Sequence, residues 1–305
     1  MTDTDHPDAS AIRAVDEQAL VFDCQGEALV GILHRPARPR RRGIVVVVGG
    51  GPQYRAGGHR QLTLWARALS ADGFPVLRFD YRGMGDAHGE FRGFLDVDDD
   101  IRAAVDALQQ TEPDVDEVVL WGECDAASAI LMYAHRDPRV RGAVLLNPWV
   151  RTEAGAAQAV LRFYYLQRVM QPSFWKKLVS GRLDIMGSLR SAWQLWQQSR
   201  ADEGRTVTPE AAVSLGAAIS RNQPLPDAML SGLQRFAGPV MLVMSGRDLI
   251  AREFDVLLKA SASWQQALAS RAVTRHDMAD GDHTFSSALQ RNQVLAWGRD
   301  WLESW

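Results

Sequence analysis

The sequence predicts an α/β fold, with a mostly parallel, doubly wound sheet and an inserted helical cap. From Ile44 onward, short apolar segments alternate with segments of helical spacing, which is typical of a parallel sheet covered on both faces. The chain has 305 residues, 46% of them hydrophobic, and is long for one simple domain. Between Asn147 and Pro239 the alternation stops, and amphipathic stretches replace strands. We therefore expect an insertion there.

The elements are predicted in chain order from hydrophobic period and turn residues. Residues 1–17 are polar without period, and we expect a mobile tail. A β-hairpin follows, formed by Ala19–Cys24 and Ala28–Leu33. The predicted parallel strands are Ile44–Val48, Pro75–Phe79, Glu117–Trp121, Val140–Leu146, Val240–Ser245 and Ala272–His276. The predicted helices are Gln61–Ala71, Val97–Gln109, Ala126–His135, Glu253–Ala269 and Ser286–Glu303, with Asp96 and Thr284 near two helix starts.

The predicted domain organisation is a core of residues 18–149 and 238–305, interrupted by a cap of residues 150–237. The interval that begins at Trp149 is dense in aromatic side chains, namely Trp149, Phe163, Tyr164, Tyr165, Phe174, Trp175, Trp193 and Trp196. Packing of a small helical subdomain explains them. The alternative is that some line an apolar substrate pocket between cap and core.

Composition narrows the function classes. The 34 basic and 37 acidic side chains form no basic excess or stripe, so we expect no nucleic-acid partner. The longest aliphatic run, Ile44–Val48, is too short to span a membrane, and the N-terminus is acidic, so we expect a cytoplasmic protein without membrane insertion. Cys24 and Cys124 lie far apart without zinc-ligand spacing, so we expect neither a disulfide nor a metal. Cys24, within a strand, is expected to be buried and inert.

Chemically capable residues follow the predicted strands. Ligands of parallel α/β sheets bind beyond the carboxyl ends of the strands. Cys124, Asp248 and His283 come shortly after three of these strands, in that order. A candidate nucleophile, a candidate acid and a candidate base are therefore expected to meet at one edge of the sheet.

Across residues 19–305 the sequence resembles the α/β-hydrolase superfamily. Its elbow pattern G-x-nucleophile-x-G is met by Gly122-Glu123-Cys124-Asp125-Ala126, with cysteine for serine and alanine for the last glycine. The order nucleophile, acid, histidine is also that of the superfamily. Asp80-Tyr81-Arg82-Gly83-Met84-Gly85 is similar to its D-x-R-G-x-G turn, which we interpret as structural. The resemblance implies the α/β-hydrolase fold.

A more specific resemblance rests on five segments taken together, namely G-G-G-P-Q-Y-R with G-H-R, G-E-C-D-A-A-S-A, S-G-R-D-L-I-A-R-E-F and G-D-H-T-F-S. Their combination resembles the exosortase A system-associated hydrolase 1 family, a branch with cysteine in the elbow. The resemblance implies a cytoplasmic enzyme that serves an envelope or exopolysaccharide locus. The family name identifies no substrate.

The chemistry of these residues suggests their roles. Cys124 would attack a carbonyl, with its thiol pKa lowered by the start of the following helix. His283 would take the thiol proton, and Asp248 would hold the histidine tautomer. Asp280 and Asp282 are rivals for the acid, but both are too close in sequence to His283 to lie on a separate strand end.

The oxyanion hole should combine the backbone N–H of Asp125 with one from the loop after Val48. Superfamily members with H-G-x-P in this loop use the residue before the proline, which corresponds to Gly51. The leading histidine is missing here, so Gln53 is the next candidate, whereas Pro52 has no N–H.

Four further residues are candidates for substrate binding, namely Gln53, His59, Glu123 and Trp149. A lone loop histidine such as His59 more often has no role in a site. Glu123 and Asp125 are most simply solvated, outward-facing charges. The alternative is that one of these carboxylates tunes or restrains the thiol.

The predicted function is a hydrolase or acyltransferase that forms a thioester acyl-enzyme on Cys124 from a small-molecule ester, thioester or lactone, without a cofactor. One alternative is a catalytically silent scaffold that binds a ligand or protein partner. Another is ring opening of the dienelactone-hydrolase type, since those enzymes also have a cysteine elbow. The sequence does not determine the acyl group or the oligomeric state.

Overall fold

The computed structural model describes residues 16–49, 54–150 and 224–305. Residues 1–15 of the predicted tail and residues 151–223 of the predicted cap, with seven of its eight named aromatics, lie outside these ranges. The first strand begins at Asp16, two residues before the predicted start of the core.

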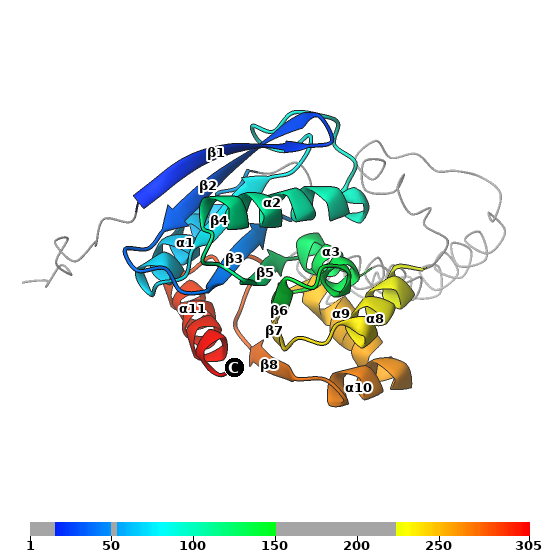
Figure 1. The fold of residues 1–305 in the computed structure, drawn as a ribbon. Coiled ribbons are helices and arrows are strands. Elements are labelled where there is room, and N and C mark those ends of the chain that lie inside the picture. The colour runs from blue at the N-terminus through cyan, green and yellow to red at the C-terminus, as the bar shows by residue number, and fades with distance from the viewer. Residues whose placement is uncertain (1–15, 50–53, 151–223) are drawn as a thin grey trace, which may run out of the picture. The chain divides into compact units, whose positions relative to one another are not determined.

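The sheet has eight strands in the order β1-β2-β4-β3-β5-β6-β7-β8. β1 and β2 form the predicted hairpin at one edge, β2 runs antiparallel to β4, and the other neighbours are parallel (Figure 1). The mostly parallel α/β sheet is thus confirmed. The strands are β1 (Asp16–Cys24), β2 (Glu27–Arg35), β3 (Arg42–Val47), β4 (Val76–Asp80), β5 (Glu117–Glu123), β6 (Val140–Leu146), β7 (Val240–Ser245) and β8 (Val273–Met278).

The helices of the described residues are η2 (Gly58–Arg60), α1 (Gln61–Ala71), η3 (Phe94–Asp96), α2 (Asp98–Thr111), α3 (Asp125–Tyr133), η4 (Ala134–Arg136), α8 (Leu225–Arg235), α9 (Leu249–Ala260), α10 (Ala262–Ala269) and α11 (Ala288–Glu303). The predicted helix Glu253–Ala269 is wrong as a single element. It is divided at Ser261, whose side chain accepts from the N–H of Trp264 and so starts a second helix.

Two expected helix starts also differ. Asp96 lies in η3, and α2 begins after Val97. Ser287, rather than Thr284, caps α11, because its hydroxyl accepts the N–H of Gln290 at 3.2 Å.

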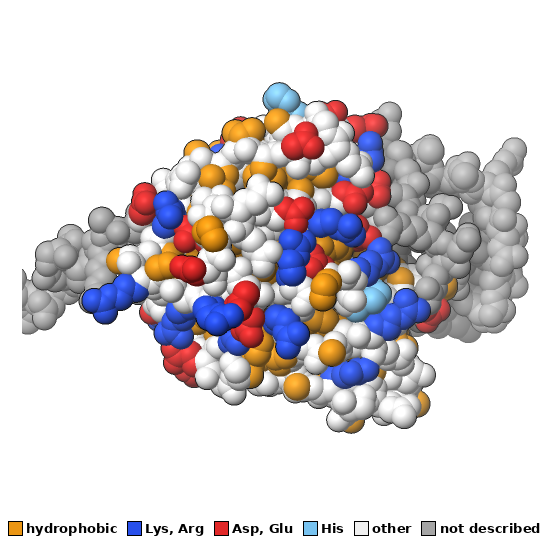
Figure 2. Space-filling model, viewed as in Figure 1, with side chains coloured by type: hydrophobic (Ala, Val, Ile, Leu, Met, Phe, Trp, Pro, Cys, Tyr) orange, Lys and Arg blue, Asp and Glu red, His pale blue; other side chains and the backbone are white. Residues whose placement is uncertain are grey.

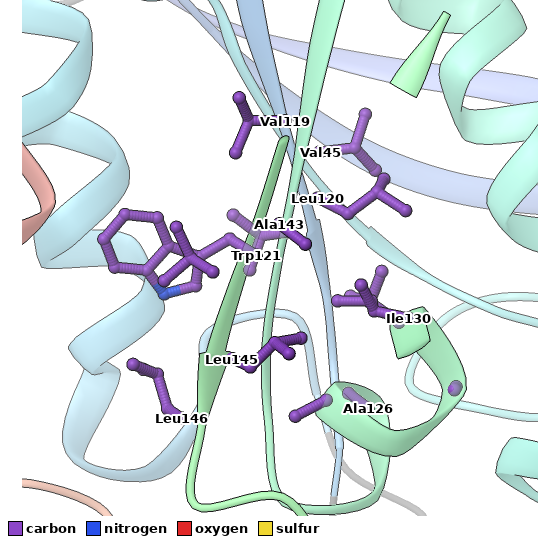
Figure 3. Packing of buried hydrophobic residues seen from close by; sticks show 14 of the residues in the cluster. Val45, Val119, Leu120, Trp121, Ala126, Ile130, Ala143, Leu145 and Leu146 are labelled. Atoms are coloured by element: carbon purple, nitrogen blue, oxygen red, sulfur yellow. The ribbon is translucent and has the colours of Figure 1, made fainter. Parts of the chain in front are cut away.

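Helices cover both faces of the sheet, because consecutive residues of β5 point in opposite directions. Figure 3 shows Trp121 on one side and Leu120, near Ile130 of α3, on the other. The ring of Trp121 contacts Trp65 of α1 at a centroid distance of 5.8 Å. It also lies so close to α11 that a Cβ at Gly298 would be 2.6 Å from it. The doubly wound arrangement therefore follows from the alternation along a buried strand.

Helix α8, which the sequence analysis placed within the cap, packs on the core. Its buried positions Leu225, Met229 and Leu233 repeat every four residues and form one apolar face. A Cβ at Gly232 would lie 1.9 Å from the carbonyl oxygen of Leu131 in α3, so the two helices touch through their backbones. The core thus resumes before residue 238, the predicted boundary.

The surface shown in Figure 2 carries basic and acidic side chains side by side. Ion pairs also join distant segments of the chain, for example Arg42 with Glu117 at 2.8 Å and Arg40 with Glu303 at 3.1 Å. The exposed pair of Arg40 and Glu303 contributes about 0–1 kcal/mol to stability. Within the described ranges, no helix combines the length and the apolar character that crossing a membrane requires.

Candidate active site

Cys124 occupies a sharp turn between β5 and α3. Its backbone angles, φ 59° and ψ −127°, are strained for a residue with a side chain. Small neighbours permit the turn, because a Cβ at Gly122 would lie 2.6 Å from Ile130 and one at Gly49 would lie 2.3 Å from the carbonyl oxygen of Glu123. Such a strand-to-helix turn is the geometry of a nucleophile elbow.

Asp248 and His283, which are 35 residues apart, are in direct contact. The distance from His283 Nδ1 to Asp248 Oδ2 is 2.7 Å. Asp248 is buried and also caps α9, accepting the N–H groups of Ile250 and Ala251 at 3.0 and 3.2 Å. These three donors hold its carboxylate in one orientation.

Asp282 and Asp280, the two other candidates for the acid that contacts His283, have different surroundings. Asp282 accepts the N–H of Ser286 at 2.9 Å and bonds its hydroxyl. Asp280 is exposed. Of the three carboxylates, Asp248 is the one that the structure places on the imidazole.

His283 also hydrogen-bonds the thiol of Cys124. The bond with Asp248, followed by the bond with Cys124, raises the pKa of His283 to about 11. The three side chains expected to meet therefore form one chain of contacts, from Cys124 through His283 to Asp248. At neutral pH the imidazole in this chain is held in its protonated form.

The thiol itself is the opposite of what the helix dipole led us to expect. Burial raises the pKa of Cys124, and the charge of Asp125 adds to the increase. The hydrogen bonds from His283 and from the N–H of Asp125 act in the other direction without outweighing burial. The predicted lowering was wrong, because the cost of enclosing a thiolate exceeds the help from one helix end.

The carboxylates beside the thiol do not face solvent, so the simpler interpretation of them was also wrong. Asp125 is buried. The carboxyl of Glu123 accepts the side-chain N–H of Gln61 at 2.5 Å, and burial raises its pKa to about 8. Gln61 was not anticipated, since nothing in the sequence relates the first residue of α1 to the end of β5.

The other substrate-binding candidates lie at different places. Trp149 is beside the elbow, where its backbone N–H donates to the carbonyl of Cys124 at 3.1 Å. Its ring meets that of Phe94 edge-on, with 5.4 Å between the ring centroids. His59 is exposed in η2. The pKa of Asp282 is lowered because the hydrogen bonds with Ser286 outweigh burial, and the charge of His59 contributes. Gly51 and Gln53 lie outside the described residues.

The D-x-R-G-x-G turn anchors the chain that follows residue 53. Asp80 is completely buried and accepts the backbone N–H of Arg55 at 2.7 Å and that of Asp86 at 3.0 Å. Arg78 donates to the carbonyl of Arg55 at 2.7 Å. Gly85 has φ 49°, and a Cβ there would lie 2.3 Å from Asp80. The turn thus holds the backbone at Arg55 and Asp86, which agrees with its interpretation as structural.

Asn147 and Ser245 support the histidine loop and were given no role in the sequence analysis. Asn147 is buried, with φ 46°, and its side chain accepts the N–H of Ser245 at 2.8 Å. The same amide donates to the Ser245 hydroxyl and to the carbonyl of His283, both at 2.9 Å. Ser245 donates in turn to the carbonyl of Asp282 at 2.9 Å. The ends of β6 and β7 thereby locate the backbone that carries His283.

We expect Asn147→Asp to lower kcat by about ten- to a hundredfold with little change in KM, because a carboxylate cannot donate to the His283 carbonyl and misplaced groups lose rate. Asp tolerates the left-handed backbone nearly as well as Asn. Steady-state kinetics would measure the effect, with exposed Asn292→Asp as the matched control. A rise in KM alone would contradict this role.

Among the described residues, no cluster of three or more His, Cys, Asp or Glu side chains could hold a metal ion.

A family model described as serine aminopeptidase, S33 (Hydrolase_4) matches residues 39–285, well over half of the chain. The chain belongs to the Hydrolase_4 family. Hydrolase_4 carries serine in its description, whereas this member has Cys124 in its elbow.

Individual proteins are also similar to this chain. A 134-residue segment is 29% identical to the quorum-quenching protein AidA of Acinetobacter baumannii, covering 42% of each chain. The esterase Pf2001 of Pyrococcus furiosus is similar in structure, with a TM-score of 0.64 and 13% identity over 96% of this chain and 91% of that one. The acylaminoacyl peptidase of Pyrococcus horikoshii gives 0.62 and 12% over 96% and 42%. At such identities the two structures show the α/β-hydrolase fold.

Proposed function

We propose that this hydrolase forms a thioester acyl-enzyme on Cys124 and passes the acyl group to water or to another acceptor. The observation that carries the proposal is the contact chain from Cys124 through His283 to Asp248, which starts at a strained elbow. A buried, packed cysteine without a base would need neither the strain nor the histidine.

In the proposed first step, one proton leaves the Cys124–His283 pair and the sulfur attacks the carbonyl carbon. The oxyanion accepts a hydrogen bond from the backbone N–H of Asp125. The expected second donor is the backbone N–H of Gly51, with that of Gln53 as the alternative. The C–S bond forms, the bond to the leaving group breaks, and His283 gives the leaving group its proton. In the second step His283 takes a proton from water, an alcohol or an amine, which attacks the thioester and frees the sulfur.

The proposed substrates are small molecules with activated acyl groups, such as thioesters, lactones and activated esters. A thiolate attacks these groups readily and leaves a thioester that can still react with several acceptors. The resemblance carried by the five segments together supports a place in an exopolysaccharide or exosortase-associated pathway.

The test is to incubate the protein with p-nitrophenyl esters and acyl thioesters of increasing chain length and to measure intact mass. We expect one adduct, mapped to Cys124, which Cys124→Ala removes. Cys24→Ala is the matched control and keeps the adduct, because Cys24 is buried at the end of β1 and burial raises its pKa to about 11. Neither adduct nor turnover across the series would indicate a silent scaffold instead.

A further inference from the structure

Glu123 is a half-buried residue whose carboxyl the proposed steps do not use. Its Oε2 accepts from Nε2 of Gln61 at 2.5 Å. Its Oε1 is buried, and no described residue donates to it; the same holds for Oε1 of Gln61. An ionised carboxylate needs several donors or an adjacent cation when it is enclosed. The single neutral amide of Gln61 does not replace several donors or a cation.

A proton on Oε1 of Glu123 would supply a donor where two buried oxygens, this one and Oε1 of Gln61, lack one. Protonated on Oε1, Glu123 becomes neutral and gains a donor, while Oε1 of Gln61 is an acceptor on the side chain already bonded to it. Burial raises the pKa of Glu123 to about 8, against the opposing effects of His283 and the Gln61 bond. Glu123 is therefore a carboxylic acid at neutral pH and ionises in mildly alkaline solution.

The charges around Glu123 show which group it affects. The charge of His283 favours its ionisation, and those of Asp248 and Asp282 oppose it. Among the neighbouring carboxylates, it is Asp125 whose charge raises the pKa of the Cys124 thiol. The basic side chains of η2, which directly precedes Gln61, are His59 and Arg60. Since electrostatic coupling is reciprocal, ionised Glu123 must stabilise the imidazolium of His283.

We propose that Glu123 is a positioning residue that acts through His283: it is silent as a neutral acid, and when ionised it opposes proton loss from the Cys124–His283 pair. The proposal rests on the proposed Cys124 chemistry, because that chemistry begins with this proton loss. With thiol and imidazolium both protonated, the pair carries one positive charge. A nearby negative charge stabilises that state relative to the pair that has lost a proton, so it slows the formation of the nucleophile.

The test compares wild type with Glu123→Gln, which is shaped like the neutral acid. Iodoacetamide labelling of Cys124 is measured from pH 6 to pH 10 by peptide mapping. We expect the ratio of the variant's rate to that of wild type to be near one at low pH and to rise about five- to tenfold above pH 9, since a shift of one pKa unit is tenfold. Glu117→Gln, at the other end of β5, is the matched control and leaves the ratio flat.

A ratio for Glu123→Gln that stays flat to pH 10 overturns the proposal. If that variant does not fold, Gln61→Met provides the second measurement. It removes the bond that favours ionisation of Glu123, so labelling at pH 8–9 should be faster than in wild type, and an unchanged profile overturns the proposal.

Labelling requires no substrate. Loss of the acyl adduct would therefore overturn the proposed function without changing the ratio, and a flat ratio would leave the adduct intact.

Discussion

Asp248→Asn should lower turnover by about 10²–10⁴-fold and barely change the melting temperature. Asn can still cap α9, since Asn and Asp are nearly equal as N-caps. Its amide N–H₂ faces Nδ1 of His283, where the carboxylate now accepts, so the imidazole is forced into the tautomer that cannot take the thiol proton. The pKa of His283 should fall as well, because the Asp248 bond is the largest cause of its increase. Steady-state kinetics, calorimetry and an NMR titration of His283 would measure these effects.

Two variants complete this experiment. Asp282→Asn is the matched control and should keep nearly wild-type turnover, since its side chain serves Ser286 rather than the imidazole. Asp248→Ala should lose turnover and, with the cap, about 1 kcal/mol of stability. Full activity in Asp248→Asn, with loss in Asp282→Asn, would show that the acid is Asp282.

Cys124→Ser should lower the rate of acyl transfer from thioesters and oxygen esters by at least about a hundredfold, or about 2.7 kcal/mol of activation free energy. The thiol can lose its proton while His283 keeps its own, giving a thiolate beside an imidazolium. A serine hydroxyl is far less acidic and needs neutral His283, whereas the bond with Asp248, the largest cause of the raised pKa of His283, remains in the variant. Single-turnover kinetics with p-nitrophenyl esters would measure the rate.

Serine at position 128 provides the control for this substitution. Ser128→Ala removes a buried hydroxyl in the same helix α3, one that bonds the carbonyl of Trp149, and should retain the Cys124 adduct. If Cys124→Ser equals or exceeds wild type on oxygen esters, the site is not tuned for a thiol.

Much of the fold could be predicted because its signals are local. Helix α1 has the predicted bounds, and the strand that precedes Cys124 is a continuous apolar run followed by glycine. The division of the helix before Ala269 was missed although Ser261, a good N-cap, stands at the break. Helix α8 was assigned to the cap because its apolar period does not reveal which surface it covers.

The site could be predicted in part for the same reason. Strand ends locate Cys124, Asp248 and His283 at one edge of the sheet. The supports behind them join residues that are far apart in the chain, as Asn147 joins Ser245 across 98 positions and Gln61 joins Glu123 across 62. No spacing rule connects such pairs.

The sequence by itself determined the α/β fold, the elbow and the order of nucleophile, acid and base, because hydrophobic period and turn residues act over a few positions. Only the tertiary structure decided which protons the site holds. A pKa depends on how completely a group is enclosed and on which charges lie beside it, and the enclosing residues come from separate strands and helices. For this reason the pKa of the Cys124 thiol, which the helix dipole was expected to lower, is raised instead.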